Sequence, residues 1–289
     1  MTLDRVGIWT SELGYLPADT VRSAVGQLDG AGFAGLWAPE STWVDPFVLA
    51  ALALSSSERL YFATGVARIH GRRAQTMVNA WSALSGWYPD RFVLGLGVSH
   101  QPSVEDQLHG TYQAPLATMR TYLDELDKAH YSGIETERRR VVLAALGPKM
   151  LVLASERTQG AHLYLAPVES TGYAREIVGG DSWLVPEIKV VFDRDPHTAR
   201  ALARRHISRP LQLPNYANNL GRIGFAPDEV TNVSDPVVDA LVAWGGDDDV
   251  AARVRAHLDA GADQVAVQVL SADRGSLLDG WRRLASALT

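Results

Sequence analysis

The stretch DVAARVRAHLDAGADQVAVQVL, residues 249–270, contains a helix pattern followed directly by a strand pattern. An acidic residue suits the first turn of a helix, and Val250, Val254 and Leu258 then recur on one helical face. Gly261 is a typical stop signal. The apolar run 263–270 that follows has the composition of a buried strand. The stretch therefore predicts one helix–turn–strand unit of an α/β fold.

A similar unit lies near the other end of the chain. Residues 18–32, ADTVRSAVGQLDGAG, place apolar side chains on one helical face and end in glycines. The apolar run 33–39 follows directly. Because the same winding recurs near both ends, the sequence predicts one domain over residues 1–289 rather than two.

Eight apolar runs have the length of strands. Most are continuously apolar rather than alternating, as strands covered on both faces of a parallel sheet should be. They occupy residues 5–10, 33–39, 59–67, 91–98, 140–146, 161–166, 187–193 and 263–270. Because helical patterns separate them, the sequence favours an α/β fold of the (β/α)8 TIM barrel type over an open doubly wound sheet.

Two stretches do not fit a minimal barrel. Residues 162–183 are long for one crossover, and residues 208–236 contain four prolines and little periodicity. A structureless loop of that length is uncommon in a compact domain. We therefore expect insertion segments near strands 6 to 8. The main insertion, at about residues 209–243, should form short helices over one end of the barrel.

The composition is that of an ordinary globular protein, with 46% hydrophobic and 21% charged residues. No apolar run approaches the roughly 18 residues of a membrane span, and the first residues lack the basic start and apolar centre of a secretion signal. The net charge of −6 disfavours non-specific nucleic-acid binding. The chain has no cysteine, so disulfides and cysteine-based metal sites are excluded. We expect a cytoplasmic protein with neither membrane nor nucleic-acid partners.

The active site of a barrel lies at the carboxyl ends of its strands, so the residues after each apolar run are candidates. These residues form a polar rim with one carboxylate, Glu40, and one well-placed histidine, His100. No histidines have metal-ligand spacing, and the motifs GxGxxG and GxSxG are absent. The sequence therefore predicts neither a metal site nor a Rossmann phosphate loop.

The run RFVLGLGVSH, residues 91–100, brings His100 to this rim. Gly95 and Gly97 would thin the end of the strand so that a flat ligand could approach the backbone. An imidazole can give or take a proton near neutral pH without a large pKa shift. His100 is therefore a candidate proton donor, and the alternative is a histidine that caps a loop or satisfies a carbonyl.

Four blocks of the sequence, in order, resemble the bacterial luciferase-like monooxygenase superfamily. They are GFAGLWAPES, RFVLGLGV, LAALGPKMLVLASERTQGAHLYLAP and GGDDDVAARVRAHLDAGADQVAVQVL. The chain looks closest to the branch of actinobacterial oxidoreductases that use the deazaflavin coenzyme F420. The resemblance implies a barrel with an insertion near the seventh strand, usually a homodimer. It also implies a flavin or deazaflavin held at the carboxyl end.

The resemblance further implies which residues hold the cofactor. Thr64-Gly65-Val66 falls at the family's third-strand bulge, which often has a non-prolyl cis peptide and backs the deazaflavin ring. Gly97-Val98-Ser99 would lie beside the ring. Leu146-Gly147-Pro148-Lys149 matches the turn whose amides hold the cofactor phosphate, and anions do favour the start of a helix.

A basic run that begins at a strand end has two interpretations. Arg68, His70, Arg72 and Arg73 could bind the anionic tail of a deazaflavin, because an acidic protein needs a local positive patch for that task. Such a preference for the tail would favour F420 over FMN. The alternative is a solvated loop, which is the usual role of a charge run.

The chain departs from the sugar-phosphate dehydrogenases of this group. They carry Glu in GTGE after the fourth strand, where this chain has Val98-Ser99-His100, and His after the second-strand acid, where it has Ser41. Their substrate-phosphate lysine aligns near Pro167. The sugar-phosphate reaction is therefore not implied. Glu40, the second-strand acid, is a candidate catalytic group, and the alternative is a structural hydrogen-bond acceptor in the rim.

Three functions remain open. The first is hydride transfer between F420 and a small organic substrate, in which the cofactor does the redox chemistry and the protein positions it and supplies a proton. The second is an FMN-dependent monooxygenase on the same fold. The third is a non-catalytic flavin-binding relative. The first is the function that we expect.

Overall fold

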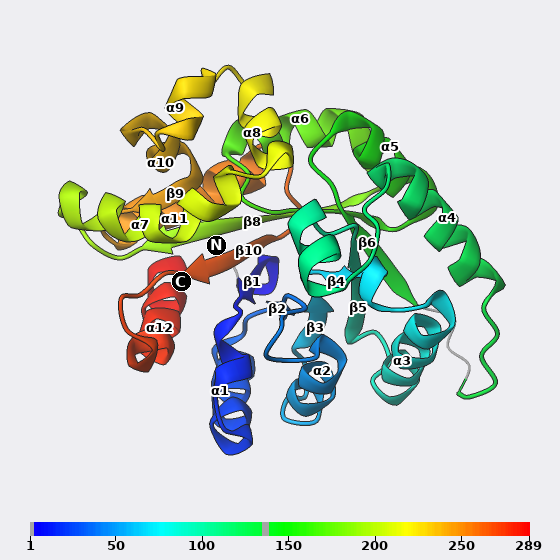
Figure 1. Cartoon of the computed structure of the whole chain (residues 1–289). Helices are drawn as coiled ribbons and strands as arrows, with labels where there is room; N and C mark the ends of the chain where they lie inside the picture. The colour runs from blue at the N-terminus through cyan, green and yellow to red at the C-terminus, as the bar shows by residue number, and fades with distance from the viewer. Residues whose placement is uncertain (1–2, 135–138) are drawn as a thin grey trace.

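The chain forms a closed barrel of parallel strands, which Figure 1 shows surrounded by helices. The computed structural model describes residues 3–134 and 139–289. Strand β10 pairs with both β8 and β1, which closes the ring. The barrel strands are β1 Val6–Trp9, β2 Gly35–Ala38, β3 Tyr61–Thr64, β5 Phe92–Gly97, β6 Arg140–Ala144, β7 Gly160–Leu163, β8 Trp183–Val191 and β10 Val265–Val269. The predicted (β/α)8 TIM barrel is confirmed, and each predicted apolar run supplies one of these strands.

Helices cover the outside of the barrel because each buries one apolar face. In α1, the predicted face of Val21, Val25 and Leu28 is at most 2% exposed. The helix ends at Gly32, whose φ of 90° is a left-handed conformation that glycine adopts without steric cost. The outer helices are α1 Ala18–Ala31, α2 Pro46–Leu54, α3 Ala74–Trp87, α4 Pro115–Lys128, α5 Pro148–Arg157, α6 Val168–Val178, α11 Asp247–Asp259 and α12 Leu277–Leu288. Short helical turns are η1 Leu3–Arg5, η2 Glu12–Tyr15, η3 Ile69–Gly71, η4 Ser103–Gln107 and η5 Arg274–Ser276.

The stretch 162–183 is an ordinary crossover, so the expectation of an insertion there was wrong. It contains the end of β7, the helix α6 and the start of β8. Pro167 immediately precedes α6, and Gly179 ends it with a φ of 75°. These residues interrupt the periodicity of the sequence because they mark the ends of one helix.

Residues 196–244 form a group of helices that we call the cap. Figure 1 shows its helices, in yellow-green to gold, gathered at one side of the barrel. They share an apolar core that also includes Leu165, Val191 and Leu270, from the carboxyl ends of β7, β8 and β10. Three of the four prolines in the sequence stretch lie at helix starts, where proline is favoured. The cap elements are α7 Pro196–Leu211, α8 Pro214–Arg222, α9 Pro227–Thr231, α10 Asp235–Leu241 and β9 Val242–Trp244.

The interior of the barrel is filled by side chains rather than open. Trp37 is fully buried and Trp9 is 5% exposed, as expected of core fillers. His162 stacks on Trp37 with ring centroids 4.4 Å apart. A packed interior leaves the carboxyl end of the barrel as the place where this fold can carry a site. Among the described residues, no helix is long and apolar enough to cross a membrane.

Candidate functional site

The chain bulges after β3 at the predicted position. The Gly65–Val66 peptide is cis, and the short strand β4, Ala67–Arg68, then resumes pairing with β5. The hydroxyl of Thr64 donates to the carbonyl of Gly95 at 2.7 Å and accepts from its N–H at 2.8 Å. Thr64 is fully buried, so its side chain ties the bulge to β5.

Gly95 and Gly97 make room for this bulge. A Cβ on Gly95 would overlap the carbonyl oxygen of Thr64, and a Cβ on Gly97 would lie 2.5 Å from Cγ2 of Val66. The expectation that these glycines leave space for a flat ligand was therefore wrong, because the protein's own chain fills that space. A ligand on this side of the mouth would meet the bulge itself.

His100 follows β5 and contacts the cap. Ser99, just before it, has a φ of 59°, and the imidazole that follows is half-buried. The Nε2 atom lies 3.5 Å from the hydroxyl oxygen of Tyr216 on α8, and the two ring centroids are 5.5 Å apart. Burial lowers the pKa of the His100 imidazole, because the charged form loses solvation.

Three aromatic rings continue inward from His100. Tyr216 packs beside Tyr164, with ring centroids 5.9 Å apart, and Tyr164 packs beside Trp9 at 5.2 Å. Tyr164 follows β7 and Trp9 ends β1, so the contacts join the cap to the barrel wall. Neither Tyr164 nor Tyr216 was predicted from the sequence as a site residue.

A buried ion pair lies beneath these rings. Lys189 Nζ donates to Glu187 Oε1 at 2.6 Å and to Gln268 Oε1 at 2.8 Å, and it lies 4.1 Å from the ring centroid of Tyr164. The other carboxylate oxygen of Glu187 accepts the N–H of Leu165 at 3.1 Å. Burial lowers the pKa of Lys189, and the charge of Glu187 opposes that effect. The sequence signal was available in EIKVVFD, where two charges two residues apart on a strand must share one face.

Glu40 is held by the residues after β3. Its Oε2 accepts the backbone N–H of Arg68 at 2.7 Å, and its Oε1 lies 3.7 Å from Nε of Arg72. Among the described residues no hydrogen bond joins Glu40 to His100. Of the two interpretations of Glu40, the structural acceptor accounts for its contacts.

The basic run is divided between packing and the surface. Arg72 pairs with both Glu40 and Asp45, and its guanidinium lies 4.8 Å from the ring centroid of Phe47. It is therefore neither a solvated residue nor a free cation. Arg68 donates to Gln107 at 3.3 Å, and Arg73 is exposed at the start of α3. Arg68 and Arg73 remain as the arginines of this run that could meet an anionic ligand.

The predicted phosphate turn lies at the start of α5. Gly147 is the N-cap without a side-chain hydrogen bond, Pro148 is the first helical residue, and Lys149 is exposed. Arg222 of the cap donates to the carbonyl of Leu146 at 3.3 Å. A Cβ on Gly147 would lie 3.6 Å from Nη2 of Arg222, which is an ordinary contact.

Arg222 is itself held in place. Its Nη1 donates to Oδ1 of Asn219 at 3.0 Å, and the amide nitrogen of the buried Asn219 donates to Ser170 of α6 at 2.9 Å. The cap thus brings a guanidinium to the turn at the start of α5. No sequence signal could have placed it there, because the contact depends on how the cap folds back.

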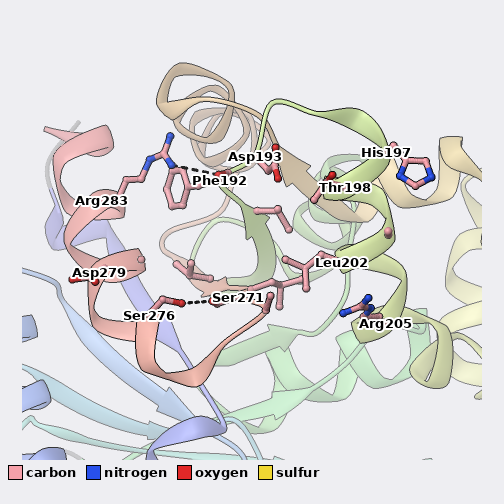
Figure 2. Close-up of a pocket in the computed structure, with 16 residues that line it drawn as sticks. Phe192, Asp193, His197, Thr198, Leu202, Arg205, Ser271, Ser276, Asp279 and Arg283 are labelled. Carbon is pink, nitrogen blue, oxygen red and sulfur yellow. Dashed lines mark hydrogen bonds between the residues drawn. The ribbon is translucent and has the colours of Figure 1, made fainter.

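Two surface cavities are lined in part by cap residues. One of about 620 Å³ separates α7 from α12, and Figure 2 shows Arg283 on one side of it and Arg205 on the other. Arg283 is engaged by Asp247 at 2.7 Å. The second, of about 890 Å³, lies within the cap and has Arg222 at its edge. Among the described residues no group of three His, Asp or Glu side chains could hold a metal ion.

Comparison with known families identifies the fold. The model of the luciferase-like monooxygenases matches residues 1–264. The chain belongs to this family. The predicted family is thereby confirmed, and three of the similar solved structures are oxidoreductases by description. A search of curated proteins gave no significant match.

Solved structures share the fold at low sequence identity. An F420-dependent secondary alcohol dehydrogenase in complex with an F420–acetone adduct superposes with a TM-score of 0.77 at 12% identity, over 99% of both chains. The F420-dependent tetrahydromethanopterin reductase of Methanopyrus kandleri gives 0.69 at 14% identity, over 96% of both chains. The oxygenating constituent of 3,6-diketocamphane monooxygenase from Pseudomonas putida, in complex with FMN, gives 0.70 at 14%, over 99% of this chain and 98% of that one. The neighbours therefore include both deazaflavin and flavin proteins.

Proposed function

We propose that the protein is an oxidoreductase that transfers hydride between coenzyme F420 and a small organic substrate at the carboxyl end of the barrel. The observation that carries the proposal is the start of α5, where the uncapped Gly147 turn lies beside the guanidinium of Arg222. Helix amides and a guanidinium together favour a phosphate. These residues fit the phosphate of either a deazaflavin or a flavin.

The ring of the cofactor is assigned to the other side of the mouth. Thr64-Gly65-Val66 would back the ring, and Gly97-Val98-Ser99 would border it through the bulge that packs on β5. When bound, the deazaflavin supplies the hydride chemistry. The buried Thr64 would hold the bulge rigid through its two hydrogen bonds to Gly95, so the surface that meets the ring is preorganised.

His100 is assigned the proton that accompanies hydride transfer. Its lowered pKa makes the imidazole neutral at pH 7, so it can accept a proton from an alcohol and return it in the reverse direction. Glu40 stays a weaker candidate for a proton role, because both of its oxygens already have partners. We also propose that the chain is a single domain, as its uniform winding indicates, and that it acts in the cytoplasm, as its composition indicates. The family resemblance further implies a homodimer.

An FMN-dependent monooxygenase is the second candidate. Arg72 is occupied by Glu40 and Asp45, which leaves fewer cations for the acidic tail of F420 than the sequence indicated. The similar monooxygenase structure that contains FMN also supports this alternative. F420 remains the first choice because two of the similar structures are F420-dependent by description.

The cofactor assignment is tested by titrating the purified protein with F420 and with FMN, followed by absorbance. We expect F420 to bind more tightly. Arg222→Gln should weaken binding of the preferred cofactor about ten- to a hundredfold, because a charge-assisted hydrogen bond contributes about 1.5–3 kcal/mol. The exposed Arg255 on α11 supplies the control, since Arg255→Gln should leave affinity unchanged. Equal affinities of wild type and Arg222→Gln for both cofactors would contradict the placement.

The proton assignment is tested by turnover. General acid–base catalysis typically contributes about 10²–10⁴ in rate, so His100→Ala should slow turnover of any accepted substrate by that range. Cofactor affinity should stay within a few fold. His197→Ala, at an exposed histidine of α7, is the control. A His100→Ala enzyme that works at the parent rate would remove His100 from the reaction.

A further inference from the structure

The cap brings Tyr216, as well as Arg222, to the mouth of the barrel. Tyr216 is 8% exposed although it belongs to a surface helix. Among the described residues, its hydroxyl is the one side-chain group within hydrogen-bonding distance of the His100 imidazole, at 3.5 Å from Nε2.

Tyr216 is supported from below by the barrel. Tyr164 packs against it at 5.9 Å between ring centroids, and Tyr164 in turn lies over the ammonium of Lys189 at 4.1 Å. Glu187 joins this support to the backbone after β7 by accepting the N–H of Leu165. The segment after β7 and the buried ion pair of β8 therefore support Tyr216 from the barrel side, which holds its ring against His100.

The hydroxyl of Tyr216 can act only as a neutral donor or acceptor. Burial raises the pKa of this phenol well above its usual value, so it keeps its proton throughout the working range of pH. A neutral imidazole has one N–H and one unprotonated nitrogen. A phenol that donates to Nε2 therefore places the imidazole proton on Nδ1.

We propose that Tyr216 is a positioning residue, whose hydroxyl donates to Nε2 of neutral His100 and fixes the tautomer and orientation of that ring. Its catalytic meaning rests on the proposed function: the hydroxyl keeps Nε2 free of a proton, and an alcohol that displaces the phenol from Nε2 gives its proton to that nitrogen. The contact itself does not rest on that function. The cap then has a task besides shaping the substrate pocket, because it completes the site with Tyr216.

The surroundings of His100 make Tyr216 the group to change. On its own segment, Glu105 is engaged by the amide of Gln101 at 3.1 Å. Behind Tyr216 lies the neutral Tyr164. The charges of Glu187 and Lys189 compensate each other, because Nζ of Lys189 lies 2.6 Å from Oε1 of Glu187. Removing the Tyr216 hydroxyl should therefore change the titration of His100 without altering another charge nearby.

The test is a nitrogen NMR titration of the histidine rings in the whole protein without cofactor. The signals of His100 are assigned by their loss in His100→Gln. We expect the wild type to carry its neutral proton on Nδ1. In Tyr216→Phe the pKa of His100 should rise by about 0.5–1 unit, because the neutral form loses a hydrogen bond while burial of the ring stays the same. Asn218→Ala, at an exposed position of the same helix, should leave it unchanged.

Two results would overturn the proposal. One is a neutral wild-type ring protonated on Nε2, which needs no variant to observe. The other is a His100 pKa that falls or stays constant in Tyr216→Phe. Where a substrate is known, Tyr216→Phe should also lower kcat several fold with KM little changed. The expected NMR result in a protein that binds neither F420 nor FMN would support the contact and refute the proposed function.

Discussion

Two glycine-containing positions at the mouth of the barrel look alike in sequence and differ in structure. Gly97 ends β5 and Gly147 precedes α5, and both follow an apolar run. A Cβ at Gly97 would lie 2.5 Å from Val66, whereas a Cβ at Gly147 would meet nothing closer than Arg222 at 3.6 Å. The first glycine is required by the protein's own packing. The second lies beside an uncapped helix start and a cation, where a ligand can come.

A glycine at a strand end or a helix start can have two structural reasons, and a single sequence does not distinguish them. One reason is a close approach of another part of the chain, and the other is an opening for a ligand. On the side of β3 and β5, the bulge closes the wall of the mouth. On the side of α5 and the cap, the helix start stays accessible. Each prediction below tests whether this division between a closed side and an open side is real.

The largest effect is expected for Gly95→Ala on the closed side. The added Cβ would overlap the carbonyl oxygen of Thr64, which belongs to the neighbouring backbone and cannot move aside cheaply. We expect a loss of about 3 kcal/mol or more in the free energy of unfolding. Urea denaturation measures it.

Gly172 in α6 is the matched control for that substitution. Nothing lies within 4 Å of a Cβ built there, and the residue is inside a helix. Gly172→Ala should therefore stabilise the protein by about 0.5–1 kcal/mol. If Gly95→Ala were as stable as the wild type, the bulge would not fill the space beside Gly95, and the description of this side as closed would be wrong.

A second test compares the histidines of the interior and of the mouth. Burial lowers the pKa of His162 to about 4, from an ordinary value near 6.5. Between these values the unfolded chain binds the proton and the folded chain does not, so stability rises with pH. The contribution of neutral His162 to the free energy of unfolding is complete above pH 6.5. About 3 kcal/mol of that free energy is lost progressively as the pH falls toward 4.

The measurement is the free energy of unfolding from pH 4 to pH 8 in the wild type and in His162→Phe. The variant should show a shallower dependence on pH in the acidic range, whatever its stability at pH 7. His100→Ala should change the slope less, since that ring is only half-buried. Identical slopes in wild type and His162→Phe would mean that His162 is charged inside the fold.

Gly147→Val on the open side should act on binding rather than on folding. The backbone of Gly147 is extended, with φ −85° and ψ 149°, so a β-branched residue can adopt it. We expect a change below about 1 kcal/mol in stability, as for the loss of a favoured N-cap. Crowding of the first amides of α5 should weaken cofactor binding about tenfold. A folded variant with unchanged affinity for F420 and FMN would show that the opening is not used.

The smallest effect is expected for Arg73→Gln. Arg73 is exposed, and surface ion pairs contribute about 1 kcal/mol or less. F420 affinity should fall a few fold at low salt, and FMN affinity should not change because FMN lacks the acidic tail. The difference should vanish at high salt, since exposed charges are then screened within about 3 Å. Equal effects on the two cofactors would place the tail elsewhere.

The barrel was predictable because its signals are local. Eight buried runs and the helix faces between them follow from side-chain periodicity, and the glycine stop at Gly32 from backbone sterics. The family resemblance led to the bulge at Gly65 and Val66, which the structure contains. The stretch 162–183 was misjudged because the ends of α6 were taken for irregular structure.

The composition of the mouth was harder to predict because its contacts are non-local. The hydroxyl of Tyr216 lies 3.5 Å from His100 although 116 residues separate them, and Arg222 meets Leu146 at 3.3 Å across 76 residues. Those contacts depend on how the cap folds back onto the barrel. Lys189 is different, since its spacing from Glu187 placed both on one face of a strand. That spacing was overlooked within an otherwise apolar run.

The central claim is that the cofactor spans the two sides of the mouth, with its ring on the closed side and its phosphate on the open side. A crystal structure of the protein with F420 tests it most directly. We predict the ring against Gly65 and Val66, and the phosphate within hydrogen-bonding distance of the first amides of α5 and of Arg222. A phosphate bound instead in the cavity between α7 and α12, or a ring that does not touch the bulge, would contradict the account.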